Sequence, residues 1–468
     1  MYFMLAALFC VLQLCYAHEV VPFWKVNEAR KSYPEIPSAG SKDPRVNIAQ
    51  LAKLRGARYL HDLMQQSGLG VYRLKLFEDR VILADPVAIQ AAYNTRLTEK
   101  SLDFGLANAN TFGLRGYLPS SNSNGVKKAI KKRGMWKILK RAQKEHGTDG
   151  LYKILKKHWE AVLPTFKPNE TSIDRLLDEV KIRTITEFYF GKPFDLDIGI
   201  PAKWFSKSLT PKNNPNMKID DETIELNKIM YGYIDSTPWA RTVSSFWYRL
   251  GDWRSAETLK SEALFFAFVF SAFSFSESRF ISEKSGMSMS VPLFLNLDSK
   301  SKNTILEEVE RFKKEDGKDI DEKLENFDVT DRFILEIFRF SPPVTRVFAR
   351  ARTNFLLDSI QGRYFIPKGT YFTAFSYGAQ RNPYTFRFPN EFAMTGDTDH
   401  SKENMFTFGG PYNQKPTIHN RKCLGQDLAS KMLKMLITLY AQCDIELVDE
   451  PMSFFRDNKP VKATKFKC

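Results

Sequence analysis

Apolar residues recur at helical spacing in two stretches of this chain. Leu428, Met432, Leu436 and Leu439 follow one another every three or four positions, so they share one face of a helix near the C-terminal end. Residues 263–280 are nearly all apolar, which predicts a helix that is buried on most sides.

Shorter patterns predict strands and further helices. Residues 70–76 alternate between apolar and polar positions and predict a strand, and residues 80–84 predict a second one. The Asp85-Pro86 pair directly after it is typical of a helix start. Residues 127–166 predict one or two basic helices, and residues 304–332 predict acidic helices.

The stretch before the C-terminal helix carries the candidate chemistry. Residues 406–425, FTFGGPYNQKPTIHNRKCLG, contain glycines, prolines and asparagines that predict a loop. Cys423 lies just before the helix start, where backbone N–H groups and the helix dipole favour a thiolate. A thiolate there suits a haem iron, and Arg421 can meet a haem propionate. A buried structural cysteine is the alternative interpretation.

Two further motifs precede this loop in a fixed order. Glu336 and Arg339 form an E-x-x-R pair on one helix face, followed directly by FSPPV, and Asn382-Pro383-Tyr384 comes next. In this order the motifs resemble the cytochrome P-450 superfamily. The longer loop, with GGP, four residues, PT, two residues and NRKCLGQD, is similar to the branch of allene oxide synthases, fatty-acid hydroperoxide lyases and epoxyalcohol synthases. The resemblance is clear over residues 331–448.

The resemblance implies a mainly α protein with small β-sheets, folded as a single-domain cytochrome P-450. The domain would cover residues 18–468, with haem b between the buried long helix and the cysteine loop. No linker or repeat divides the chain, which agrees with one large domain. The Glu336–Arg339 pair would then have a structural rather than a catalytic role.

The resemblance also assigns residues to the haem. Cys423 would be the axial iron ligand, and Arg421 would bind a propionate. The branch uses a lysine of the basic helix on a propionate, and Lys132 is our choice for it. Phe112 would supply an aromatic ring over the haem; a buried loop aromatic is the alternative interpretation of this residue.

The apolar stretch of residues 263–280 bears on the reaction. It contains no threonine and its first acid is Glu277, whereas an oxygen-activating member of the superfamily carries an acid–threonine pair here. Ser271 stands where the branch has an asparagine that would hold the hydroperoxide. Its hydroxyl could serve the substrate or instead bond to a carbonyl of its own helix.

The implied substrate is a polyunsaturated fatty-acid hydroperoxide, whose O–O bond is cleaved without O2, NADPH or a reductase. The resulting radical can close to an epoxyalcohol, break to aldehydes or lose hydrogen to an allene oxide. Loss of the asparagine weakens the allene oxide outcome. A reductase-dependent monooxygenase of a lipophilic substrate and a non-catalytic haem or lipid binder remain alternatives.

Charge and composition add a surface feature. The chain has 468 residues and a net charge of +15, and residues 127–144 hold nine basic residues and no acid. A peripheral membrane contact with anionic lipid and a solvated helix face are both open interpretations. Nucleic-acid binding is disfavoured because no nucleic-acid motif accompanies the cluster.

The N-terminal residues and the cysteines bear on the compartment. Residues 1–17 are uncharged and apolar, which favours a cleaved signal peptide over a retained anchor and predicts a location in the secretory pathway or endoplasmic reticulum. Asn169-Glu170-Thr171 is a lone glycosylation motif that agrees with this. The five cysteines show no disulfide or zinc framework, although Cys443 and Cys468 could pair in an oxidising lumen.

Overall fold

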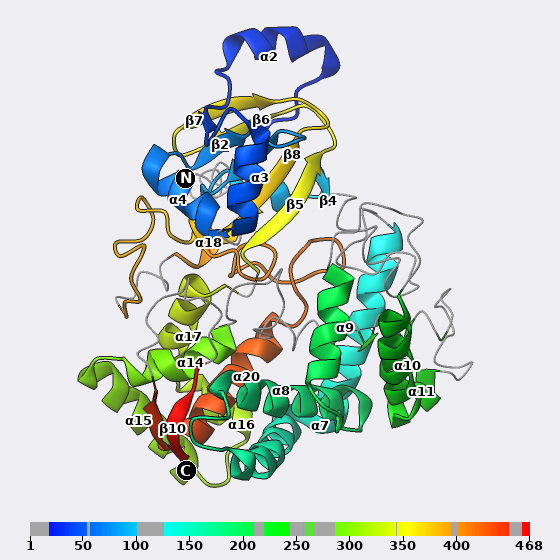
Figure 1. Cartoon of the computed structure of the whole chain (residues 1–468), viewed down its shortest axis with the longest axis vertical. Helices are drawn as coiled ribbons and strands as arrows, with labels where there is room; N and C mark the ends of the chain where they lie inside the picture. Colours follow the sequence, from blue (N-terminus) through cyan, green and yellow to red (C-terminus); the bar gives the residue numbers. More distant parts are fainter. Residues whose placement is uncertain are drawn as a thin grey trace, which may run out of the picture. The chain divides into compact units, whose positions relative to one another are not determined.

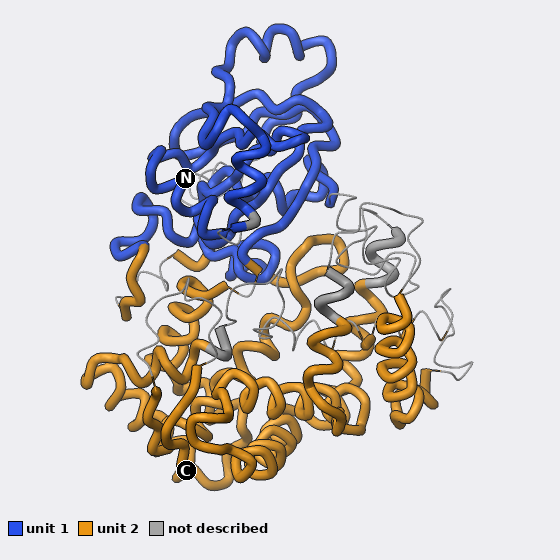
Figure 2. Tube along the Cα trace, in the orientation of Figure 1, with its two compact units in different colours: residues 1–101, 345–389, 403–414 blue, residues 102–344, 390–402, 415–468 orange. Residues whose placement is uncertain are grey.

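The computed structural model describes residues 18–53, 57–100, 126–209, 220–243, 256, 259–260, 263–264, 267, 286–342, 344–394, 401–448 and 461–468. The chain forms two compact units, which Figure 2 distinguishes by colour. Unit 1 contains residues 1–101, 345–389 and 403–414, and unit 2 contains residues 102–344, 390–402 and 415–468. Each unit is thus assembled from three separate stretches of the chain.

A six-stranded sheet in the order β1-β2-β3-β8-β5-β4 lies in unit 1 (Figure 1). Its strands are β1 (Ser38–Ala39), β2 (Val71–Leu74), β3 (Arg80–Leu83), β4 (Thr98–Lys100), β5 (Arg346–Ala351) and β8 (Tyr371–Phe375). The alternating pattern correctly predicted β2 and β3, which pair antiparallel with Val71 opposite Leu83. β3 and β8 pair in parallel, which joins the N-terminal strands to the later part of the chain.

Short helices and a second two-stranded sheet complete unit 1. The second sheet pairs β6 (Phe355–Ser359) with β7 (Gly362–Ile366). The helices are η1 (Phe23–Lys25), α2 (Val26–Ser32), α3 (Pro44–Lys53), α4 (Ala57–Ser67), α5 (Ile89–Tyr93), α18 (Ser376–Ala379) and η3 (Lys402–Asn404), whose first residue falls in unit 2. The helix expected at Asp85-Pro86 begins at Ile89 instead, with Ala88 as its N-cap. Asp85 caps the turn before this helix, because its Oδ1 accepts hydrogen bonds from the N–H groups of Val87 and Ala88, both at 2.8 Å.

Unit 2 is mainly helical. Its described elements are α7 (Val126–Val162), η2 (Leu163–Thr165), α8 (Ile173–Phe190), α9 (Gly199–Leu209), α10 (Asp221–Asp235), α11 (Pro238–Val243), α14 (Gly286–Leu295), α15 (Ser299–Lys314), α16 (Ile320–Glu325), α17 (Asp328–Phe340), α20 (Gln426–Tyr440) and the hairpin of β9 (Asp444–Leu447) and β10 (Ala463–Lys467). The basic helix α7 packs against α8 and α20. It bends at Gly147, which has a φ of 61°, so one or two basic helices was the right expectation.

Polar side chains at helix starts determine several of these boundaries. Ser172, Asp220, Asp298 and Asp319 each accept a hydrogen bond from a backbone N–H three residues later, at α8, α10, α15 and α16. The acidic stretch around residues 304–332 is therefore divided into α15, α16 and α17.

The start of α17 has a different cap. Phe327 precedes this helix and offers no hydrogen-bonding side chain. Buried Glu308 of α15 accepts the N–H groups of Val329 and Thr330 instead, at 2.8 and 2.9 Å. Glu308, which is 21 and 22 positions away from these two residues in the sequence, thus satisfies free N–H groups of the helix that carries Glu336 and Arg339.

The C-terminal hairpin of unit 2 is covalently closed. A disulfide joins Cys443, which precedes β9, to Cys468 at the end of β10. The pairing that the sequence left open is thus present in the structure.

No helix among the described residues is long and apolar enough to cross a membrane. The leader of residues 1–17 lies outside the described part of the chain. On α7, the side chains of Arg133, Lys137, Lys140 and Lys144 are exposed at spacings of three and four residues, which makes a basic stripe along one face. Contact of this stripe with a membrane stays a prediction.

Candidate haem-thiolate site

Cys423 lies two residues before Gly425, the N-cap of α20. The Gly425 N–H donates to the Cys423 Sγ at 3.4 Å, as expected for a sulfur placed at a helix start. Among the described residues Cys423 is the one free cysteine, because Cys443 and Cys468 are bonded to each other. The loop therefore presents a single sulfur atom, held by a backbone amide.

The electrostatics of this sulfur differ from the simple expectation of a favoured thiolate. Burial raises the pKa of the Cys423 thiol above its usual value, and this effect outweighs the Gly425 N–H and the nearby cations Lys132 and Lys422, which lower it. Desolvation disfavours the charged form of any buried thiol. The helix start alone is thus insufficient, and positive charge at the sulfur is needed to hold the thiolate.

Lys132 of α7 is tied directly to the cysteine loop. Its Nζ donates to the Lys422 carbonyl oxygen at 2.6 Å and to the Asn420 carbonyl oxygen at 3.0 Å, and it lies 3.2 Å from the Asn420 Oδ1. The lysine is 3% exposed, and burial lowers its pKa to about 8. In this structure its ammonium group fixes the loop backbone, and a contact with a haem propionate stays a prediction.

Asn420 organises the same part of the loop from within. Its Oδ1 accepts the N–H groups of Thr417 and Lys422, at 3.0 and 3.2 Å, and its Nδ2 donates to the Lys415 carbonyl oxygen at 2.8 Å. Asparagine suits this role because one side chain can accept and donate at once. The segment before Cys423 therefore has one fixed conformation, to which Lys132 is anchored.

Two site residues escaped the sequence reasoning. Lys422 is fully buried next to the cysteine, and burial lowers its pKa to about 7. Tyr189 of α8 is buried within electrostatic range of Cys423, and burial together with that thiolate raises the pKa of its phenol. Lys422 was visible as a sequence neighbour of Cys423, whereas no local signal pointed to Tyr189.

Glu336 and Arg339 form a buried ion pair on α17. The guanidinium Nε and Nη2 of Arg339 donate to the two carboxylate oxygens of Glu336, at 2.8 and 2.5 Å. The pair also binds the backbone of a later segment, because Arg339 donates to the Glu391 carbonyl oxygen and Glu336 accepts the Ala393 N–H at 2.9 Å.

The segment that the ion pair binds follows Arg387, whose guanidinium lies over the ring of Phe388 at 5.3 Å. The polar contacts with the ion pair come from backbone groups of residues 391 and 393. The ion pair therefore fixes the chain by binding its backbone, as a structural role requires.

The other candidate site residues are Phe112, Ser271 and Arg421. Phe112 and Ser271 lie outside the described residues, as does most of the apolar stretch 263–280. Arg421 is half-buried two residues before the cysteine, and its contact with a propionate stays a prediction.

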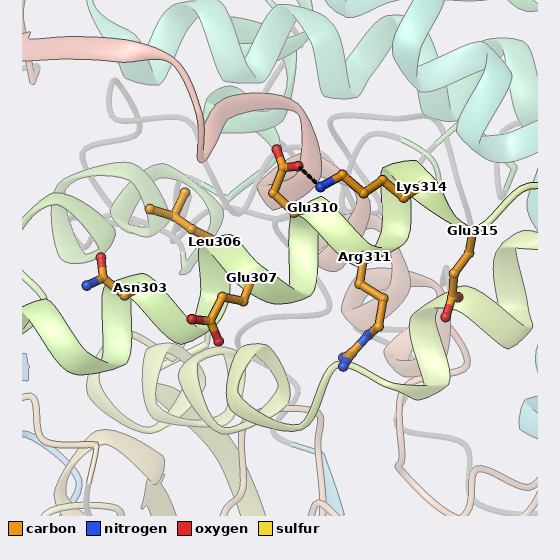
Figure 3. Close-up of a pocket in the computed structure, with 7 residues that line it drawn as sticks. All are labelled: Asn303, Leu306, Glu307, Glu310, Arg311, Lys314 and Glu315. Carbon is orange, nitrogen blue, oxygen red and sulfur yellow. Dashed lines mark ion pairs between the residues drawn. The ribbon is translucent and has the colours of Figure 1, made fainter.

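A charged hollow of about 730 Å³ lies elsewhere, along α15 (Figure 3). Its lining comes entirely from that helix and the residue that follows it, and includes the exposed Glu310–Lys314 ion pair at 3.2 Å. Six of its seven lining residues are polar or charged, and none is a cysteine. This hollow is therefore separate from the candidate site.

The residues around Cys423 fit a haem. The site offers one sulfur ligand, a backbone N–H directed at that sulfur and two nearby lysines, a combination that suits a thiolate-ligated iron. Half-buried Cys423 would hold the iron, and the iron would supply positive charge beside the thiolate.

Comparisons with known proteins agree with this geometry. The cytochrome P-450 family profile matches residues 293–450, which include the Glu336–Arg339 pair and Cys423. Among solved structures, the haem domain of cytochrome P-450DA is similar with a TM-score of 0.63 and 16% identity, over 93% of this chain and 97% of that one. The fold is thus that of the cytochrome P-450 haem domains, and the chain is similar to this family over the region that contains the candidate haem-thiolate site.

Within this class the chain is similar to enzymes of hydroperoxide metabolism. An allene oxide synthase of Parthenium argentatum is 26% identical over 144 residues, which is 29% of this chain and 30% of the relative. A fatty acid hydroperoxide lyase of Solanum lycopersicum is 26% identical over 125 residues, 26% of each chain. A 9-divinyl ether synthase of Capsicum annuum is 26% identical over 133 residues, 28% of each. The matches span less than a third of these relatives.

Proposed function

We propose that this protein is a haem-thiolate enzyme that rearranges or cleaves polyunsaturated fatty-acid hydroperoxides. The observation that carries the proposal is the similarity of part of this chain to an allene oxide synthase and a fatty acid hydroperoxide lyase. The family profile separately covers the region that contains both the ion pair and the cysteine loop. A thiolate-ligated haem can cleave a peroxide O–O bond without electrons from a reductase. The proposed reaction therefore needs neither NADPH nor O2.

The chain's own residues would prepare the sulfur for this chemistry. Lys132 and Asn420 hydrogen-bond to the loop backbone just before Cys423, which restrains the segment that carries the sulfur. Lys132 and Lys422 place positive charge near the sulfur, which favours the thiolate over the thiol. The Glu336–Arg339 pair fixes residues 391–393 in the same unit.

For the product, we propose an epoxyalcohol or aldehydes ahead of an allene oxide. The support is Ser271, which replaces the asparagine of the branch. A serine hydroxyl is shorter than an asparagine amide and offers one donor in place of two. It would hold the hydroperoxide less firmly.

The test is turnover of linoleate and arachidonate hydroperoxides by the purified, haem-loaded protein without NADPH. Loss of the conjugated-diene absorbance is followed, and products are identified by mass spectrometry with chiral separation. We expect fast turnover to one dominant stereoisomer of an epoxyalcohol or to one aldehyde pair. Free haemin at equal concentration is the control, because unbound haem degrades peroxides to racemic mixtures.

Variants make the test specific. Cys423→Ala should abolish turnover, and Lys137→Met on the exposed face of α7 should leave it unchanged. A dominant α-ketol, the hydrolysis product of an allene oxide, would overturn the product order. No turnover by a protein with a full haem spectrum would overturn the proposed activity and favour a non-catalytic haem or lipid binder. NADPH consumption with a reductase would instead favour a monooxygenase.

A further inference from the structure

The turn around Asn169 presents an asparagine side chain to solvent. Asn169 lies between η2 and α8, is exposed, and has a φ of 62°, the one positive value among the described non-glycine residues. Asparagine is one of the few residues that tolerate this left-handed conformation. Among the described residues no hydrogen bond involves its side-chain amide, so this amide is accessible in the folded protein.

Backbone contacts fix this turn in place. The Asn169 N–H donates to the Ala463 carbonyl oxygen at 2.9 Å, and the Thr171 N–H donates to the Lys167 carbonyl oxygen at 3.0 Å. The Thr171 Oγ1 accepts the Lys167 N–H, also at 3.0 Å. A bulky group on the Asn169 amide would therefore extend into solvent without breaking a contact that holds the turn.

The strand β10, whose Ala463 accepts the Asn169 N–H, is followed by a cysteine that forms a disulfide, and a disulfide indicates an oxidising compartment. Ala463 is the first residue of β10, and Cys468 directly after this strand forms the disulfide with Cys443. Disulfides persist in the secretory pathway and are rare where cellular thiols keep the medium reducing. The same compartment contains the machinery that glycosylates asparagine in the Asn-x-Thr pattern.

From these observations we propose that Asn169 carries an N-linked glycan and that this part of the chain faces the lumen of the secretory pathway. The apolar leader of residues 1–17 supplies a route to that compartment. The proposal rests on Asn169, Thr171 and the disulfide, and is independent of the proposed catalytic activity.

Glycosylation of Asn169 and oxidation of the two cysteines both use reactants of that compartment. The Asn169 amide nitrogen bonds to the anomeric carbon of a lipid-diphosphate-linked oligosaccharide, the carbon–oxygen bond to the diphosphate breaks, and one amide proton is released. Cys443 and Cys468 give up two electrons and two protons to the disulfide of a thiol–disulfide oxidoreductase, which is thereby reduced to a dithiol. Cys423 takes no part, which leaves its sulfur for the haem.

The test uses the full chain with its own leader, expressed in eukaryotic secretory cells. Peptide N-glycosidase should increase its gel mobility by one glycan step, and cleavage in heavy-oxygen water should mark residue 169 as aspartate in a peptide map. Asn169→Gln and Thr171→Ala should abolish the shift, whereas Thr171→Ser, which keeps the acceptor pattern, should retain it. Non-reducing mass spectrometry should find the peptides of Cys443 and Cys468 linked.

A second chain, with a strong signal peptide in place of residues 1–17, separates the site from the leader. An unmodified Asn169 in this secreted chain would overturn the glycosylation site, because the acceptor would then have met the machinery and failed to react. An unmodified Asn169 with free Cys443 and Cys468 in the chain with its own leader would overturn the lumenal location. A glycan together with the linked peptides would establish both parts of the proposal.

Discussion

Substitution of Lys132 by methionine is a sharp test of how this protein holds its cysteine. The variant keeps a side chain of similar length and removes the ammonium group, so the carbonyl oxygens of Asn420 and Lys422 lose a donor at 3.0 and 2.6 Å. A buried acceptor left without a partner costs about 1–3 kcal/mol, which gives about 2–6 kcal/mol for the two. Because both acceptors belong to the cysteine loop, this cost destabilises the loop conformation.

An opposing effect comes from the charge itself. Burial lowers the pKa of Lys132 from 10.5 to about 8, so the protein maintains a buried ammonium group at neutral pH against desolvation. A pKa change of this size corresponds to about 3 kcal/mol, which the methionine variant recovers. The two effects oppose each other, so we expect a net change in the free energy of unfolding between about 1 kcal/mol of stabilisation and about 3 kcal/mol of destabilisation, while the loop loses its anchor.

The assays therefore examine the loop as well as the whole protein. In haem-loaded Lys132→Met we expect a larger thiol-ligated fraction in the ferrous carbon monoxide spectrum. Amide hydrogen exchange at residues 415–425 should become faster, and Tm should follow the net change in stability. Lys137→Met, at an exposed position of the same helix, is the matched control and should match the wild type in all three measurements.

Two outcomes would refute this reasoning. Unchanged exchange in residues 415–425 would show that Asn420 and the rest of the loop hold their conformation without the lysine. A normal thiolate spectrum combined with weaker haem retention would show that Lys132 acts on a propionate, as the family resemblance implies.

Three further predictions concern stability, measured by urea unfolding. Arg339→Met leaves the Glu336 carboxylate buried without its partner and should lower the free energy of unfolding by about 3–5 kcal/mol. Adding Glu336→Gln should recover part of this loss. A loss below about 1 kcal/mol would contradict the structural role of the pair. Burial lowers the pKa of His18 to about 4, so the unfolded chain binds more protons than the native one between pH 6.5 and 4. Stability should therefore fall as the pH drops through this window, by about 3 kcal/mol, and His18→Gln should flatten the fall; an unchanged pH profile would contradict it. Cys443→Ser should lower the free energy of unfolding by about 3 kcal/mol, because it opens the loop of 25 residues that the disulfide closes. Wild-type protein treated with reductant should match this variant. A wild-type stability that does not respond to reductant would argue against the Cys443–Cys468 bond.

Local signals in the sequence predicted much of the architecture. Alternation identified β2 and β3, and helical spacing identified α20, in which Leu428, Met432 and Leu436 are buried. The helical pattern succeeds because it reflects the burial of one face of α20. β2 and β3 are each buried at three of their four positions, so both faces of these strands are covered. The E-x-x-R spacing likewise placed Glu336 and Arg339 within reach of each other.

Long-range partners could not be predicted in this way. Glu308 caps α17 from another helix, and the backbone of residues 391 and 393 binds the Glu336–Arg339 pair. Such contacts depend on where separate elements meet, and neither periodicity nor local propensity records that position.

The sequence by itself determined the cysteine loop, its position before α20 and the order of motifs that points to a haem thiolate. Only the tertiary structure decided the electrostatics of Cys423, because burial raises the pKa of its thiol while Lys132, nearly 300 residues earlier in the chain, places a cation nearby. A helix start is a local feature that consecutive residues determine. Desolvation and the approach of a distant ammonium group exist only once the chain has folded.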